Sequence, residues 1–160
     1  MEESHSKIRF ICDEQLGKLA RWLRILGQDV IYRNYFPDKD LIASAEQEGR
    51  VILTRDSHLE GKSGSVQVYL VQENYPYHQI REVVNHFRDD MILEPFSRCA
   101  DCNVMLNDIP KSEVVGRVPP FVFKTQNKFR TCPSCGRIFW SATHLKHIQA
   151  QLDDILGDLD

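Results

Sequence analysis

Apolar residues in the first half of the chain follow two alternating patterns. Short runs rich in apolar and β-branched residues predict strands, which we place at residues 8–12, 29–33, 51–54 and 66–71. Apolar residues that recur every three or four positions predict helices, which we place at residues 16–26, 38–48 and 80–87. This alternation is typical of a mostly parallel sheet with helices on both faces. We therefore expect a three-layer α/β/α fold.

The second half is organised differently. Residues 91–98 contain Pro95 and indicate a linker, so we expect one domain over residues 1–92 and a second module over residues 93–160. Residues 144–156 have the spacing of an amphipathic helix that ends at Gly157. We expect this last helix to pack on the first domain.

Two C-x-x-C pairs dominate the second module. Cys99–Cys102 and Cys132–Cys135 each put two thiolates on one tight turn, and two such turns supply the four ligands of a tetrahedral zinc site. Gly136 permits the backbone turn that the second pair needs. The long interval between the pairs favours a zinc ribbon with an extended hairpin. The alternatives are free buried cysteines, redox-active dithiols, or a mixed zinc site with His144 and His147.

Composition limits the classes of protein to consider. The 160 residues suffice for a small domain and a metal-stabilised module, and 42% apolar content is ordinary for a globular protein. No apolar run approaches the roughly 20 residues of a membrane span, and the first residues contain no apolar signal core. Five cysteines, four with zinc spacing, fit a reducing compartment better than a disulfide framework. We expect a cytoplasmic protein with no membrane partner, and the sequence does not indicate its oligomeric state.

Acidic residues follow three of the predicted strands. Asp13 ends the first strand and Asp56 follows the third, while Asp38 and Asp40 lie where the second gives way to its helix. The carboxyl ends of parallel strands meet at one edge of a sheet, so these side chains should gather there. Oxygen ligands select hard cations such as Mg²⁺ or Mn²⁺, which activate water and hold phosphate oxygens. Alternatively, Asp38 or Asp40 caps the helix, and the other two acids lie in solvated loops.

Basic residues accompany both parts of the chain. Residues 99–140 carry six Lys and Arg against three Asp and Glu, although the whole chain has a net charge of −3. The candidates for phosphate contacts are Lys18, Arg21, Arg24, Arg55, Lys124, Lys128 and Arg130. Three phenylalanines lie among the last of these and could stack on unpaired bases: Phe121, Phe123 and Phe129. The alternatives are a solvated helix face and phenylalanines that form the core of the module.

Three segments together resemble a known family. They are D-E-Q-L-G-K-L-A-R-W-L-R-I-L-G at residues 13–27, P-D-K-D-L-I-A-S-A at 37–45 and E-G-R-V-I-L-T-R-D at 48–56. With the two cysteine pairs, they are similar to the PIN-like ribonuclease family named for the C-terminal domain of the Mut-seven protein. The resemblance covers residues 7–152 and implies a PIN-like nuclease core joined to a zinc ribbon. It also implies that Asp13, Asp56 and Asp38, with Asp40 as second choice for the middle acid, bind the catalytic divalent metal.

The leading prediction is a divalent-metal-dependent endoribonuclease that hydrolyses RNA phosphodiesters and has RNA as its partner. No residue matches the fourth acid that such nucleases carry, so the alternative is a catalytically incomplete PIN-like module that binds RNA or protein. A third interpretation is a phosphoacceptor receiver that uses Asp56. It requires a hydroxyl after the fourth strand and a lysine after a fifth, and neither is found in the sequence.

Overall fold

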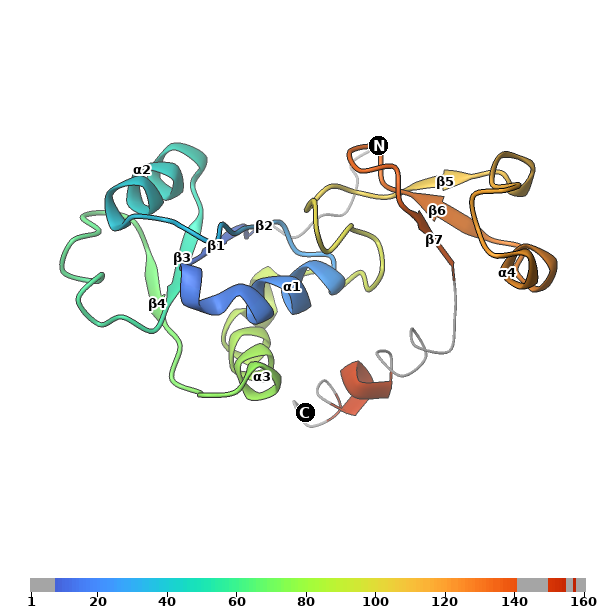
Figure 1. Cartoon of the computed structure of the whole chain (residues 1–160). Helices are drawn as coiled ribbons and strands as arrows, with labels where there is room; N and C mark the ends of the chain where they lie inside the picture. Colours follow the sequence, from blue (N-terminus) through green and yellow to red (C-terminus); the bar gives the residue numbers. More distant parts are fainter. Residues whose placement is uncertain (1–7, 141–149, 155–156, 158–160) are drawn as a thin grey trace. The chain divides into compact units, whose positions relative to one another are not determined.

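The computed structural model describes residues 8–140, 150–154 and 157. The chain divides into two units, Met1–Asn103 and Val104–Asp160, which are referred to below as the N-terminal unit and the C-terminal unit. This division lies further along the chain than the boundary expected after residue 92. Each unit has a sheet of its own, with strands coloured blue to green in the first and yellow to orange in the second (Figure 1).

The N-terminal unit is built on four parallel strands in the order β2-β1-β3-β4. The strands are β1 (Phe10–Cys12), β2 (Val30–Ile31), β3 (Val51–Thr54) and β4 (Val68–Leu70). The helices are η1 (Glu14–Leu16), α1 (Gly17–Ile25), α2 (Asp38–Glu48), α3 (Pro76–Phe87) and η2 (Arg88–Asp90). The α/β architecture expected from the alternating pattern is therefore confirmed.

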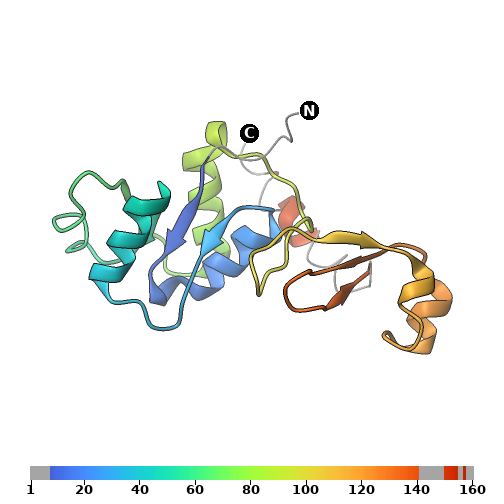
Figure 2. The same ribbon diagram turned by 90° about the horizontal axis from the view of Figure 1, so that it is seen from above.

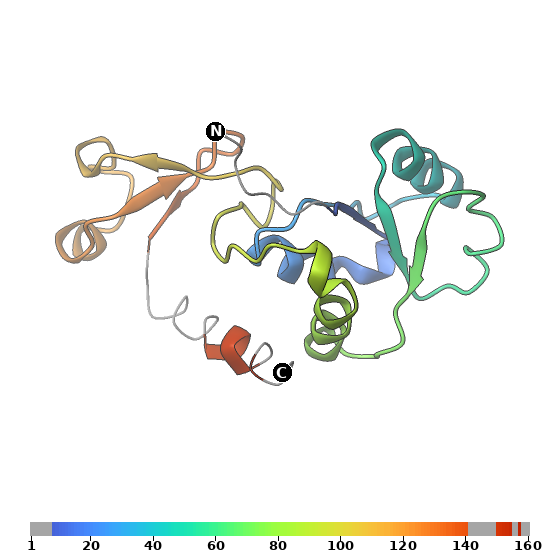
Figure 3. The same ribbon diagram turned by 180° about the vertical axis from the view of Figure 1, so that it is seen from behind.

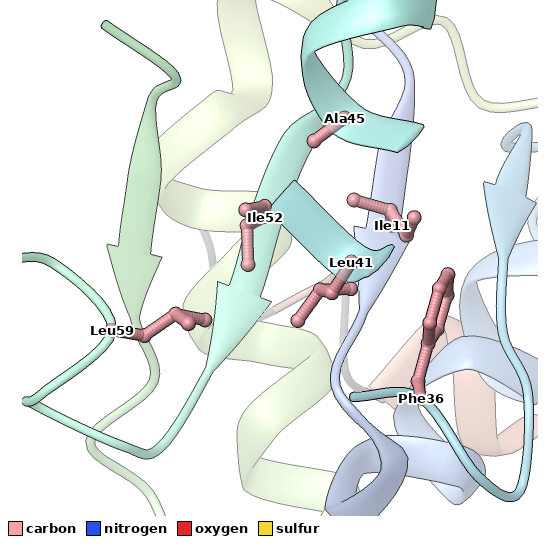
Figure 4. Close-up of a cluster of buried hydrophobic side chains, with 6 residues drawn as sticks. All are labelled: Ile11, Phe36, Leu41, Ala45, Ile52 and Leu59. Carbon is pink, nitrogen blue, oxygen red and sulfur yellow. The ribbon is translucent and has the colours of Figure 1, made fainter. Parts of the chain in front are cut away.

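Helices cover both faces of this sheet. α2 lies on one face, and α1 and α3 lie on the other (Figures 1 and 3). Successive strand residues point to opposite faces, so Ile11 of β1 packs under α2 while Phe10 contacts Phe87 of α3, with ring centroids 5.2 Å apart. The core beneath α2 contains Ile11, Phe36, Leu41, Ala45, Ile52 and Leu59 (Figure 4).

The ends of the helices explain two loop positions. α2 ends at Gly49, whose φ of +65° favours glycine, as expected. Neither Asp38 nor Asp40 caps this helix, because Pro37 is its N-cap residue. The capping alternative for these two acids is therefore wrong.

Residues 91–98, expected to be a linker, are hydrogen-bonded to the end of α1. The backbone N–H groups of Glu94 and Phe96 donate to the carbonyls of Leu26 (2.9 Å) and Ile25 (2.8 Å). Gly27 allows this approach, because a Cβ atom there would lie 2.6 Å from the carbonyl oxygen of Glu94. The segment thus belongs to the N-terminal unit.

A buried arginine organises the amino edge of the sheet. The side chain of Arg50 is 5% exposed and pairs with the carboxylates of Asp29 (2.8 Å) and Glu48 (2.6 Å). It also donates to the carbonyl of Phe10, and Asn103 Nδ2 donates to Asp29 Oδ1. Burial by itself would raise the pKa of Asp29, but hydrogen bonds from Arg50 and Asn103 and nearby positive charges lower it below its ordinary value.

We expect Asp29 to stabilise the protein at neutral pH and to lose this contribution in acid. Its pKa is lower in the folded than in the unfolded chain, so the contribution disappears as the pH falls below about 4, the ordinary value for aspartate. Asp29→Asn should be less stable than the parent at neutral pH, and the difference should shrink in acid. Thermal unfolding between about pH 7 and pH 3 measures it. A difference that does not change with pH contradicts the assignment.

The C-terminal unit contains a small antiparallel sheet in the order β5-β6-β7. Its strands are β5 (Asn107–Ile109), β6 (Phe129–Thr131) and β7 (Ile138–Phe139). Between β5 and β6 the chain forms η3 (Lys111–Glu113) and α4 (Pro120–Thr125) at one end of the sheet, in place of the expected extended hairpin (Figure 2). Its core holds Val114, Val118 and Phe129.

Part of the last predicted helix is described. Residues 150–154 and 157 are helical, while the other residues of that prediction, including His144 and His147, lie outside the described residues. None of the helices within the described ranges is long and apolar enough to cross a membrane.

Candidate active site and metal centre

At the carboxyl ends of β1 and β3, one hydroxyl group connects Asp13 and Asp56. Thr54 is the last residue of β3 and is fully buried. Its Oγ1 donates to Asp13 Oδ2 (2.8 Å) and accepts the backbone N–H of Asp56 (3.0 Å). Thr54 lies within the T-R-D motif, yet its role was not predicted. The signal available was a hydroxyl at the end of a buried apolar strand, directly before an arginine and an acid.

Both carboxylates are positioned by further hydrogen bonds. Asp13 is 8% exposed, and its Oδ1 accepts the backbone N–H of Glu14 (2.7 Å). Asp56 Oδ1 accepts the backbone N–H of His58 (2.9 Å). A carboxylate oxygen has two lone pairs, so these contacts leave acceptor capacity for a cation. The oxygen-only donor set fits a hard ion such as Mg²⁺ or Mn²⁺.

Asp38 and Asp40 lie in the first turn of α2. Asp38 Oδ2 is 3.6 Å from Nζ of Lys62, and Asp40 is exposed. Within the described part of the chain, three or more metal-ligand side chains come together only at the four cysteines, so the acids do not form a second such group. Which of the two supplies the middle acid stays a prediction.

Glu14, the residue after Asp13, holds the loop that follows β2. Its Oε2 accepts the backbone N–H of Phe36 (2.9 Å), and its carbonyl accepts the hydroxyl of Tyr32 (2.8 Å). These contacts join residues 18 and 22 positions apart in the sequence, so no local pattern could indicate them. They fix residues 32–36 beside Asp13.

Arg55, the residue before Asp56, holds the loop that follows β4. Its guanidinium donates to the carbonyl of Glu73 and to Asn74 Oδ1 (2.7 Å). The carboxylate of Glu82 accepts the backbone N–H groups of Gln72 (2.9 Å) and Glu73 (2.9 Å) from the other side. Arg55, a candidate for phosphate contacts, is exposed and hydrogen-bonded to this loop.

Two of the basic residues on α1 hold the first cysteine turn. Arg24 Nη1 donates to the carbonyls of Ala100 (3.0 Å) and Asp101 (3.3 Å), and its Nε donates to the carbonyl of Val30 (2.9 Å). Arg21 pairs with the carboxylate of Asp101 at 2.5 Å. These contacts favour a structural role for both arginines over the phosphate contacts expected from the sequence. Lys18 on the same helix is exposed.

The basic residues of the C-terminal unit are at its surface. Lys124, Lys128 and Arg130 are exposed, and Arg130 also pairs with Asp108 at 3.6 Å. The phenylalanines among them differ, because Phe129 is buried in the core while Phe121 is exposed. The core alternative therefore holds for Phe129 and fails for Phe121.

The four predicted cysteines come together. Their Sγ atoms all lie within 4.8 Å of one another. Zn–S bonds of about 2.3 Å in a tetrahedron place sulfur atoms roughly 3.8 Å apart, which this cluster can meet with small adjustments. The four residues, Cys99, Cys102, Cys132 and Cys135, can therefore hold one zinc ion.

The two cysteine turns share one backbone design. Asn103 N–H donates to the carbonyl of Cys99 (2.8 Å), and Gly136 N–H donates to the carbonyl of Cys132 (2.9 Å). Both residues have positive φ, +66° at Asn103 and +75° at Gly136, a region that asparagine and glycine tolerate best. The role expected of Gly136 is confirmed, and Asn103 is its counterpart in the first turn.

Comparison with known proteins adds one finding. The chain matches the Mut7-C RNAse domain family over residues 8–152. No curated protein and no solved structure matches it. The matched range contains the Asp13–Thr54–Asp56 arrangement and all four cysteines, and it spans most of the chain. As its three sequence segments predicted, the protein belongs to the Mut7-C RNAse domain family.

Proposed function

We propose that this protein is a divalent-metal-dependent ribonuclease that hydrolyses RNA phosphodiester bonds at the carboxyl edge of its parallel sheet. The observation that carries the proposal is the buried Thr54 hydroxyl, which connects Asp13 and Asp56 in a chain of an RNAse family. Both carboxylates keep acceptor capacity beyond their hydrogen bonds within the chain, and a bound cation would use it.

Asp13, Asp56 and Asp38 are the residues that would hold Mg²⁺ or Mn²⁺. When bound, such an ion stabilises developing negative charge and makes a coordinated water more acidic. The chain itself orders two of these ligands, Asp13 and Asp56, in advance, while Asp38 pairs with Lys62 and does not join them in one group. The Thr54 hydroxyl and the N–H of Glu14 donate to the two oxygens of Asp13. The backbone N–H of Asp56 donates to the Thr54 hydroxyl, and its carboxylate accepts the N–H of His58. Ordered ligands lose less conformational entropy on binding.

Exposed basic residues would bind the RNA, and the zinc ion would stabilise the unit that carries most of them. Lys18, Lys124, Lys128 and Arg130 are exposed and suit phosphate contacts. A structural zinc ion on the four cysteines would support the surface that carries the last three. Because such thiolates must stay reduced, we place the protein in the cytoplasm.

An RNA cleavage assay tests the function. Zinc-loaded protein is incubated with single-stranded and hairpin RNA with and without added Mn²⁺ or Mg²⁺, and cleavage that requires the added ion is expected. Protein with Asp13→Asn and Asp56→Asn, purified in parallel, controls for contaminating ribonuclease. RNA that is bound but uncut with both ions would overturn the proposal in favour of the incomplete binding module.

Thr54→Val should lower the cleavage rate by about 10- to 100-fold, the range found when a residue that orients a metal ligand is lost. Valine has nearly the same shape but cannot donate to Asp13 or accept from Asp56. Because buried polar groups then lack a partner, the free energy of unfolding should fall by about 1–3 kcal/mol. Thr54→Ser keeps the hydroxyl and should stay near the parent. The measurement is the single-turnover cleavage rate under conditions in which all variants are folded. A Thr54→Val protein that cuts at the parent rate contradicts the role of the hydroxyl.

A further inference from the structure

Two exposed tyrosines flank the acids at the carboxyl edge of the sheet. Asp13 and Asp56 follow the two central strands, β1 and β3. Tyr35 lies in the loop after β2 and Tyr75 in the loop after β4, which are the two outer strands. Their exposed fractions are 77% and 68%, and only one other aromatic residue in the described ranges, Phe121, is comparably exposed.

The Tyr35 loop is anchored on both sides of the tyrosine. Tyr32 donates its hydroxyl to the carbonyl of Glu14, and Phe36 donates its N–H to the carboxylate of the same residue. The ring of Phe36 is buried in the core under α2 (Figure 4). Tyr35 therefore projects from a loop held next to Asp13, and its own ring takes no part in holding that loop.

The Tyr75 loop is anchored in the same way beside Asp56. Arg55 binds Glu73 and Asn74, and the carbonyl of Tyr75 accepts the backbone N–H of Gln79 in the first turn of α3 (2.8 Å). Pro76 follows directly and begins the helix with a fixed φ. The ring of Tyr75 is tilted against that of His78, with centroids 6.3 Å apart.

Electrostatics limits what this edge can use to bind RNA. The acids there repel phosphates in the absence of a cation, and the nearby Arg55 is engaged with its loop. Aromatic rings bind nucleotides without charge, because every unpaired base offers a face for stacking. Adjacent strands are about 4.8 Å apart, so the outer strands that carry the two loops are separated by roughly 14 Å, with the acids between them.

We propose that Tyr35 and Tyr75 stack on unpaired bases on the two sides of the acid pair, so that the substrate class is single-stranded RNA. This assignment rests on the proposed function and narrows it. Bases in a duplex are already stacked and paired, so duplex RNA cannot use these rings. Stacking accepts any base, so little sequence preference is expected from this part of the surface.

Binding measurements on the Asp13→Asn/Asp56→Asn protein, which cannot cleave, test the assignment. Fluorescence anisotropy measures the binding of a labelled single-stranded 12-mer and of its matched duplex. The variants, made in that background, are alanine and phenylalanine changes at Tyr35 and at Tyr75. Each alanine change should weaken single-strand binding by about tenfold, which equals about 1.4 kcal/mol and lies in the range for one stacked base. The phenylalanine changes should leave it within about twofold, and duplex binding should not change.

The outcomes separate this inference from the nuclease proposal. If the parent cuts RNA and the alanine variants bind the 12-mer as tightly as their background protein, the stacking role is overturned, the nuclease stands, and the tyrosines are left for a protein partner. If the alanine variants lose tenfold while the parent cuts nothing, the stacking role stands without the nuclease. Equal losses on single-strand and duplex RNA would overturn the stacking role, because a stacked ring distinguishes the two.

Discussion

Zinc removal is expected to unfold the C-terminal unit and to leave the four-stranded sheet of the N-terminal unit folded. The C-terminal unit has strands of two or three residues, and its described core cluster has three buried apolar side chains with a few partly buried ones packed against them. A core of this size does not offset the entropy of ordering the chain, and in comparable modules the free energy of zinc binding supplies the difference. Hydrogen exchange after chelation under reducing conditions should show lost protection in β5–β7 and retained protection in β1 and β3.

Cysteine variants test the same expectation without a chelator. Cys132→Ser should purify with much less than one zinc per chain and should reproduce the loss of protection. Cys12→Ala is the matched control, because Cys12 is fully buried in β1, outside the cluster, and burial raises the pKa of its thiol. That variant should keep one zinc per chain and lose only core packing. Full zinc content and full protection in Cys132→Ser would contradict the four-cysteine site.

Asp13→Asn is expected to lower the cleavage rate by about a thousandfold, equivalent to roughly 4 kcal/mol of transition-state stabilisation. Asparagine can still accept the hydroxyl of Thr54, so the fold should persist, while the negative charge that holds a cation is lost. Asp89→Asn, an exposed acid on η2, controls for general charge effects. Single-turnover cleavage at saturating Mn²⁺ measures the change, and an Asp13→Asn rate within tenfold of the parent excludes a central role.

The same assay decides the middle acid. If Asp38 holds the cation, Asp38→Asn should lose activity to a similar degree and Asp40→Asn should lose little. Asp38 also pairs with Lys62, so Lys62→Met distinguishes a lost ligand from a lost ion pair. A large loss only in Asp40→Asn would move the assignment to that residue.

Local sequence signals predicted the elements that depend on local chemistry. The buried run at residues 51–54 forms β3 as expected, Gly49 ends α2 as expected, and Asp13 and Asp56 follow their strands. α4 was missed, although Pro119 and Pro120 are a helix-start signal, because the apolar F-V-F that follows also suits a strand. The three-residue spacing of Arg21 and Arg24 indicated a helix face correctly but not what that face contacts.

Contacts between distant parts of the sequence could not be predicted. β2 is shorter than predicted, and the hydroxyl of Tyr32, the residue that follows it, donates to the carbonyl of Glu14. The sequence around Arg50 and Asp29 does not indicate that these two side chains form an ion pair. Such partners depend on the three-dimensional arrangement of the strands, which residue periodicity does not specify.

Residues 91–98 were predicted to be a linker, and an exposed linker is the kind of segment that proteases cut. Their backbone is nevertheless hydrogen-bonded, since the N–H groups of Glu94 and Phe96 donate to carbonyls at the end of α1. The carbonyl of Glu94 also lies close against Gly27. A protease must bind its substrate as an extended segment, which these residues can offer only after they detach from α1. Limited digestion of the native chain should therefore spare it, and a fragment that ends before it would leave the carbonyls of Ile25 and Leu26 without these two donors.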